Sequence, residues 1–406
     1  MIFLIAFKNI WRNKARSLIV ITAVTLGLTG GLIAVAVMTG LVEQKVRSVI
    51  NTEISHLQIH SPSYLKNSEP RFVIHEPEKV MQFISQIPGV KSVCERTLLT
   101  GMAASPNSAA GVRILGVDPP REKTVTNLYS SIPDSSGGWF TGSRKNQVVI
   151  GHKLAEKLKV RLKSKIVLRF QGTDGNLYEA AFSITGIFGT ASSVFDETSV
   201  FVKKTDLDVI TGGESGIHEI AVMMKDISSI PLIQPQLKRS LPGCDVQNWI
   251  EIKPEMGLLT SVIAVEVYVI LGIILFALAF GIVNTMLMIV FERTRELGML
   301  MAVGMSKARV FNMIMLETVF LTFIGGVTGM ALGAGLIAFL GHHGIDLSVV
   351  SKGLSAYGVD TKIYPIITKA FYINLTIMIL STGVLSAIMP ARKALKLKPV
   401  EAIRIE

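Results

Sequence analysis

The chain has 406 residues, of which 49% are hydrophobic and only 17% are charged, and its mean hydropathy is +0.49. An average soluble domain carries about 25% charged residues. The high apolar content excludes intrinsic disorder, and two cysteines in a chain of this length exclude a disulfide-dense scaffold. The net charge of +11 does not indicate nucleic-acid binding, because most of the excess lies in short segments beside apolar stretches.

Four stretches without acidic or basic side chains, over 17–42, 267–291, 318–345 and 370–391, are long enough to cross a bilayer, which takes about 20 helical residues. Buried helices of soluble domains rarely extend that far, and the third stretch is rich in glycine, which favours close helix packing in lipid. A cleaved signal peptide is the alternative for the first stretch, but its apolar run is too long for one. The sequence therefore predicts four transmembrane helices, over residues 17–42, 262–291, 311–341 and 369–391.

Lysine and arginine set the predicted orientation, because they accumulate on the cytoplasmic side of a membrane. They cluster before the first span, between the second and third, and after the fourth. Both termini are therefore expected in the cytoplasm, with an amphipathic helix over 1–16 and a tail over 392–406. Residues 43–261 and the loop over 342–368 are expected outside. In the N-terminal segment, one helical face is apolar and suits the membrane interface; it carries Phe3, Phe7, Ile10 and Trp11.

Residues 43–261 predict an α+β domain with a stalk at each end. Seven short runs read as strands, at 56–60, 111–117, 147–150, 166–170, 180–187, 199–202 and 219–224. Three read as helices, at 77–87, 152–158 and 231–240. Asp174-Gly175 indicates a hairpin turn. A helix, a Pro-Gly turn and a strand-like run occur twice, around 87–90 and 241–244, which predicts two related halves with a β-rich insert over about 125–205.

The expected fold class is thus an α-helical membrane protein with four transmembrane helices and an α+β extracytoplasmic domain inserted between helices 1 and 2. Cys94 and Cys244 both fall in this domain, where a disulfide and two free thiols are equally compatible with the sequence. The histidines show no metal-ligand spacing, and there is no nucleophile elbow or phosphate-binding P-loop. No catalytic residue, no metal and no cofactor bound by this chain is predicted.

Residues 292–310, between the second and third spans, predict a short cytoplasmic helix. Its apolar residues recur at helical spacing, while charged residues gather at its start. A short helix must bury such a face against something, which predicts contact with a soluble partner; a solvated loop is the alternative.

This stretch, with the segments 6–17 and 389–404, resembles the permease superfamily of macrolide exporters, lipoprotein-releasing permeases and the cell-division permease. The resemblance covers essentially the whole chain. It implies that a second permease copy or paralogue completes eight spans, and that two copies of a cytoplasmic ABC ATPase, which use ATP and Mg, dock on this pair of permeases. It also implies a coupling helix that comprises Glu292, Arg293, Arg295, Glu296, Leu297, Gly298, Leu300, Met301 and Gly304.

Within the superfamily, residues 35–62, 148–160 and 182–202 are most similar to lipoprotein-releasing permeases of the bacterial inner membrane. This implies a lipoprotein substrate drawn from the outer leaflet of the lipid, with a periplasmic carrier as a further candidate partner. The turn at 171–179 is shorter than the hook of the carrier-binding subunit. Acyl chains are expected between the outer ends of spans one and two, against Met38, Leu41, Val42, Val262, Val265 and Val269. Drug or peptide efflux and transmembrane signalling are the alternative functions.

Overall fold

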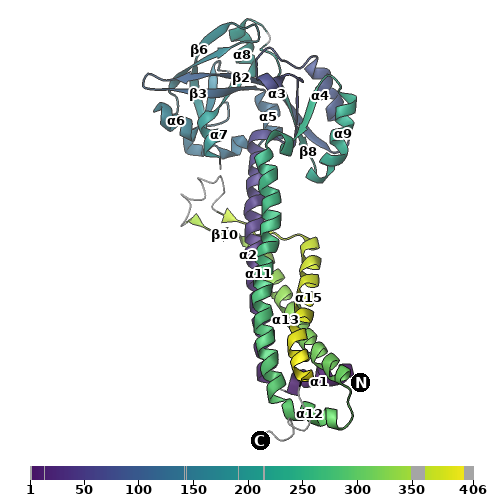
Figure 1. The fold of residues 1–406 in the computed structure, drawn as a ribbon. Coiled ribbons are helices and arrows are strands. Elements are labelled where there is room, and N and C mark those ends of the chain that lie inside the picture. Colours follow the sequence, from purple (N-terminus) through teal and green to yellow (C-terminus); the bar gives the residue numbers. More distant parts are fainter. Residues whose placement is uncertain are drawn as a thin grey trace. The chain divides into compact units, whose positions relative to one another are not determined.

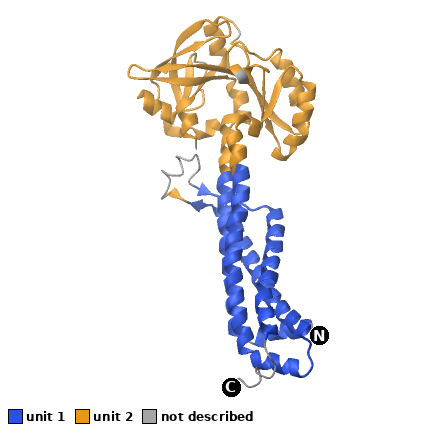
Figure 2. Cartoon of the chain, viewed as in Figure 1, with its two compact units in different colours: residues 1–42, 260–346, 362–406 blue, residues 43–259, 347–361 orange. Residues whose placement is uncertain are grey.

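The computed structural model describes residues 2–348 and 362–396, apart from Asn13, Thr141, Ser143, Ala191 and Glu214. The chain divides into two compact units (Figure 2). The first, here called the membrane unit, contains Met1–Val42, Thr260–Asp346 and Lys362–Glu406. The second, here called the extramembrane domain, contains Glu43–Leu259 and Leu347–Thr361. Much of the predicted loop over 342–368 and most of the tail over 392–406 lie outside the described residues.

Among the described residues, four helices are long and apolar enough to cross a membrane, as the sequence predicts. They are α2 (Lys14–Val49), α11 (Pro254–Glu292), α13 (Lys307–His343) and α15 (Lys369–Leu395). Each extends beyond the predicted span, because a helix satisfies its own backbone hydrogen bonds in water as well as in lipid. Two shorter helices, α1 (Ile2–Arg12) and α12 (Thr294–Ala302), lie at the same end of the bundle (Figure 1). The strands β10 (Ile345–Asp346) and β11 (Lys362–Ile363) pair with each other.

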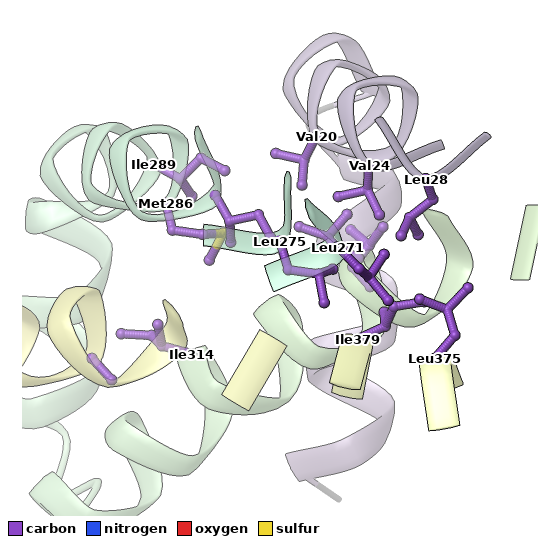
Figure 3. Packing of buried hydrophobic residues seen from close by; sticks show 14 of the residues in the cluster. Val20, Val24, Leu28, Leu271, Leu275, Met286, Ile289, Ile314, Leu375 and Ile379 are labelled. Atoms are coloured by element: carbon purple, nitrogen blue, oxygen red, sulfur yellow. The ribbon is translucent and has the colours of Figure 1, made fainter. Parts of the chain in front are cut away.

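Glycines on one face of α13 bring this helix close to α2. A Cβ atom placed on Gly329 would lie 3.0 Å from the carbonyl oxygen of Thr25, and one on Gly333 would lie 2.7 Å from the Leu32 side chain. Val24 and Leu28 of α2 point into an apolar cluster that α11, α13 and α15 also fill (Figure 3). The predicted role of the glycine-rich stretch in close helix packing is thus confirmed.

Between α2 and α11 in the chain come the elements of the extramembrane domain. Its helices are η1 (Ile50–Ile54, a π-helix), α3 (Tyr64–Asn67), α4 (Pro77–Ser85), α5 (Pro119–Val125), η2 (Leu128–Ser131), η3 (Asp134–Ser136), α6 (His152–Leu158), α7 (Ser193–Thr198), α8 (Lys204–Thr211), η4 (Ile227–Ser229), α9 (Ile230–Ser240) and α10 (Trp249–Ile252). Its strands are β1 (Leu57–His60), β2 (Val90–Ala104), β3 (Ala109–Val117), β4 (Gln147–Gly151), β5 (Lys165–Gln171), β6 (Leu177–Phe188), β7 (Ser199–Lys203), β8 (Glu219–Met224) and β9 (Asp245–Asn248).

In the described part of the domain, nine strands form one sheet in the order β3-β7-β4-β6-β5-β2-β8-β1-β9. The first part of β2 pairs with β8, and the second part pairs with both β3 and β5. Six strands therefore close a circuit, β2-β3-β7-β4-β6-β5, around an apolar core that includes Ile114, Phe170 and Phe182. The predicted Asp-Gly hairpin joins β5 to β6.

The β-rich part begins earlier than the predicted boundary near residue 125, because β3 and half of β2 belong to the closed circuit. The remaining strands, β1, β8 and β9, form a second lobe with α4 and α9, whose buried residues Ile84 and Leu237 pack against Ile59 and Val246. The two helix, Pro-Gly and strand units are present as α4 before β2 and α9 before β9. They share this lobe.

Both cysteines are free thiols in the structure, so the disulfide alternative is not the one found. Cys94 is buried in a cluster with Ala221 and Met223 of β8, whereas Cys244 packs against the cluster that contains Val222. Since successive side chains of a strand point to opposite faces, the sheet lies between the two thiols.

Candidate functional site

The connection between α11 and α13 is a sharp reversal that contains one short helix. Arg293 interrupts the helical path with φ −93° and ψ 15°, and α12 then continues only to Ala302. Gly304, with φ +103°, adopts a conformation that favours glycine and lies in the turn beyond the helix. The predicted helix over 292–304 is therefore shorter at both ends, because these two residues break it.

The apolar face of α12 packs against the protein's own bundle. Leu297 is 4% exposed and belongs to the apolar cluster of the membrane unit, and Leu300 and Met301 pack against the same cluster. The expectation that this stripe is buried by a soluble partner is therefore wrong. The face left open carries Arg295 and Glu296, together with Met299, which is 53% exposed; Val303, just beyond the helix, is 84% exposed.

Ion pairs tie this connection to the N-terminal segment. Arg12, the last residue of α1, pairs with Glu296 of α12, and Arg16 of α2 pairs with Glu292 at the end of α11. Both pairs are partly exposed, so each contributes about 1 kcal/mol or less on its own. Their value lies in geometry, because the first pair holds α12 against α1 and the second holds the end of α11 against the start of α2.

A buried carboxylate joins the same elements from within. Glu317 of α13 has a side chain that is only 6% exposed, and its Oε1 accepts a hydrogen bond of 2.5 Å from the Asn9 amide of α1. The Arg293 Nη1 atom donates to both carboxylate oxygens at 3.4 Å. Glu317 and Asn9 were not among the predicted site residues. The available signal was a carboxylate near the start of a long apolar run, which is costly unless a partner is provided.

The residues predicted to line an acyl-chain cleft lie on two helices and differ in exposure. Met38, Leu41 and Val42 are partly buried on α2, whereas Val262, Val265 and Val269 are exposed on α11. Periodicity alone could not separate these two environments, because any apolar side chain near a span end fits either of them.

Two apolar grooves do flank α11, further along the helix. One, of about 490 Å³, lies between α2 and α11 and is lined by Val20, Gly27, Leu278 and Gly281 among others. The other, of about 470 Å³, lies between α11 and α15 and includes Phe276, Phe280 and Leu385. None of the six predicted residues lines either groove. Such surfaces suit lipid or acyl chains, because both grooves are mainly apolar.

The extramembrane domain contains a separate buried charge cluster. Arg96 of β2 is 1% exposed and donates at 2.6–3.0 Å to the carboxylates of Glu122 and Glu219. Despite burial, which acts in the opposite direction, the Arg96 guanidinium lowers the pKa of Glu122. Burial raises the pKa of the Cys94 thiol and raises that of Tyr64 to about 12, so neither side chain is activated as a nucleophile. This arrangement fits a structural ion cluster.

Within the described residues, no group of three or more His, Cys, Asp or Glu side chains could hold a metal ion. The geometry thus defines a class: a membrane protein of four long helices, with a clamped short helix at one end and a large extramembrane domain.

Comparison with known proteins gives the family. The chain matches the MacB-like periplasmic core domain over residues 17–240 and the FtsX-like permease C-terminal domain over residues 268–399. It belongs to this family of ABC transporter permeases. The four apolar helices and the MacB-like core domain fit a multi-pass inner-membrane protein. The family implies a partner ATPase and a permease dimer.

Relatives with these features come from several bacteria. An uncharacterized ABC transporter permease, YknZ of Bacillus subtilis, is 23% identical over 99% of this chain and 98% of its own length. The lipoprotein-releasing system transmembrane protein LolC of Neisseria meningitidis is 20% identical over 96% of this chain and 94% of its own length. The macrolide export ATP-binding/permease protein MacB of Chlorobium luteolum is 23% identical over 99% of this chain, which spans 59% of that protein. All three names include an ABC permease or transmembrane component, and this chain is likewise the permease component of an ABC transporter.

Proposed function

We propose that this chain transmits the conformational change of a separate cytoplasmic ATPase to its extramembrane domain, with both termini in the cytoplasm. The observation that carries the proposal is the clamping of α12. Leu297 anchors this helix in the bundle, and the Arg12–Glu296 pair joins it to α1. A force applied to its open face would therefore move the bundle, because α12 cannot swing freely on its own connection. The ATPase would supply ATP and Mg²⁺ chemistry at its own site.

The cargo proposed is a lipoprotein extracted from the outer leaflet of the inner membrane for delivery to the outer membrane. The similarity to LolC along almost the whole chain supports a cargo with acyl chains. A polar solute would instead be expected to require polar side chains along the bundle.

Efflux of a drug or peptide is the second candidate function. The MacB-like core domain, which covers more than half of the chain, and the similarity to a macrolide export protein favour it. Both functions use the same clamped α12, so the cargo and the partners outside the membrane must separate them.

Docking of the ATPase is tested by placing charge on the open face of α12. Met299→Glu combined with Val303→Glu is expected to reduce co-purification of the ATPase at least about tenfold, because apolar anchors of an interface commonly contribute that much. Val209→Glu with Leu232→Glu makes the same change at exposed apolar positions of the extramembrane domain and is the control. Normal ATPase binding by the α12 variant would refute the docking assignment. Leu297→Glu is unsuitable here, since it would disrupt the bundle itself.

The cargo is tested on the complex purified gently from native membranes, with mass spectrometry of everything bound. Triacylated lipoproteins support extraction, whereas a periplasmic adaptor without lipoproteins supports efflux. Val262→Glu with Val265→Glu places charge on the exposed outer end of α11, where acyl chains are expected, and should lower lipoprotein release several-fold without changing basal ATP hydrolysis. Ile373→Glu with Ile377→Glu makes the same change at exposed positions of α15 and is the matched control. Equal release by both variants would remove the outer end of α11 from the mechanism.

A further inference from the structure

A cleft of about 600 Å³ lies within the extramembrane domain, where the chain arrives from α2 and leaves toward α11. We call it the stalk cleft. Its walls come from the end of α2, η1, β3, α7 and the start of α11. None of the functions discussed above uses it.

The stalk cleft has an excess of positive charge. It is lined by three cationic side chains, Lys45, Arg113 and Lys253, and by two carboxylates, Glu53 and Glu255. Lys253 forms an ion pair with Glu53, which is itself buried. Lys45 and Arg113 have no ion pair or side-chain hydrogen bond with any residue that the structure describes. Glu255 has no ion pair with a described residue either, so Lys45 and Arg113 leave the cleft with one net positive charge, which fits an anion.

The remaining walls restrict which anion fits. The hydroxyl-bearing residues Ser48 and Ser193 add donors that suit phosphate oxygens, as lysine and arginine do. Apolar surface comes from Val49 and Phe195, with the exposed side chain of Val194 beside them. A phosphate attached to an apolar group would contact both the polar and the apolar side chains of the cleft, whereas a small inorganic anion would contact only the polar ones.

The position of Lys45 in its helix indicates where such a ligand would come from. Lys45 is the third residue after the predicted first span and lies in the same continuous helix, α2. At 1.5 Å per residue it follows the end of that span by about 5 Å along the helix axis. Basic side chains that follow a membrane span closely along a helix commonly contact lipid phosphates.

We propose that the stalk cleft binds the phosphate group of a membrane lipid through Lys45 and Arg113. The lipid would be a resident ligand of the domain and not its cargo. This inference does not rest on the proposed function, and a chain that transports nothing could hold the same lipid.

The test is a binding titration on the full chain in an uncharged detergent, followed by thermal unfolding with tryptophan fluorescence. The ligands are a short-chain phosphatidylglycerol, inorganic phosphate, and the corresponding diacylglycerol, which lacks phosphate. Phosphatidylglycerol is expected to raise the unfolding temperature. In Lys45→Met with Arg113→Met, the half-saturating concentration is expected to rise about tenfold or more, because charge-assisted hydrogen bonds are lost.

Two further variants make the result decisive. Lys45→Arg with Arg113→Lys keeps both charges and is expected to retain most of the binding. Lys165→Met with Arg239→Met removes two exposed charges of the same domain outside the cleft and is expected to bind as the unchanged protein does. Equal stabilisation of all variants by phosphatidylglycerol, or an equal effect of diacylglycerol, would overturn the site. Inorganic phosphate binding as tightly as phosphatidylglycerol would overturn its assignment to a lipid.

Discussion

His218 and His56 are held in the extramembrane domain as neutral imidazoles. The Nδ1 atom of His218 accepts a hydrogen bond from the backbone amide of Leu98, and its Nε2 atom donates to the carbonyl of Pro70. The Nδ1 atom of His56 accepts from the amide of Met224. A proton on either Nδ1 would face an N–H group, and burial lowers the pKa of both histidines.

Acid is therefore expected to destabilise the domain. The pKa of His218 in the folded chain lies below its usual value of 6.5. Between these two pKa values, the unfolded chain binds more protons than the folded chain does. Stability is complete above pH 6.5 and decreases as the pH drops toward the folded pKa. The unfolding temperature of the full chain should fall as the pH drops from about 6.5 to about 5.

His218→Gln, which can still donate and accept, is expected to make that pH dependence shallower. His75→Gln changes an exposed histidine and serves as the control. If His218→Gln leaves the slope between these pH values unchanged, the neutral-imidazole explanation fails for this residue.

At the scale of elements, the contact between α2 and α13 depends on glycine at particular positions. Gly325, Gly329 and Gly333 recur every fourth residue and face Val24, Leu28 and Leu32 of α2. Gly335 lies on the same helix, and a Cβ atom placed on it would meet nothing within 4 Å. Gly329 is thus required for the close approach of α2 and α13, whereas Gly335, six residues further on, is not.

Gly329→Leu is expected to separate α2 from α13 and to lower the stability of the bundle by roughly 1–3 kcal/mol, as overpacking commonly does. Gly335→Leu should be nearly neutral. The measurement is the unfolding temperature of the full chain in detergent, together with ATPase co-purification. Similar losses for the two variants would show that close packing between α2 and α13 is not what these glycines provide.

At the scale of the whole molecule, length and hydropathy were sufficient to predict four long helices and an α+β domain. The strands around Ile114 and Ile184 were also predictable, since alternation and turn residues define them locally. The burial of Leu297 against the bundle was not predictable. An apolar helix face indicates that something covers it, but it does not indicate which surface does so. The role of Glu317 depends on Asn9 and Arg293, which are distant in sequence.

The same limit applies to the cysteines and to the sheet. Cys94 and Cys244 each follow a Pro-Gly turn, which made a bond between them conceivable, but strand pairing determines that they lie on opposite faces. Likewise, a strand as long as β2 can serve two lobes only if β8 and β5 reach it from different parts of the chain. Such pairings are not encoded in any local pattern.

The pairing of β1 has a consequence for how the protein is made. Leu57 lies opposite Val222 of β8 and Asn248 of β9, so this strand must wait for partners synthesised much later. During insertion, α2 is complete while the lobe around β1 is still open and has apolar residues to cover. Non-local pairing of this kind slows folding and prolongs exposure to aggregation. Chaperones on the far side of the membrane are therefore expected to matter during synthesis, before any ATPase or cargo is met.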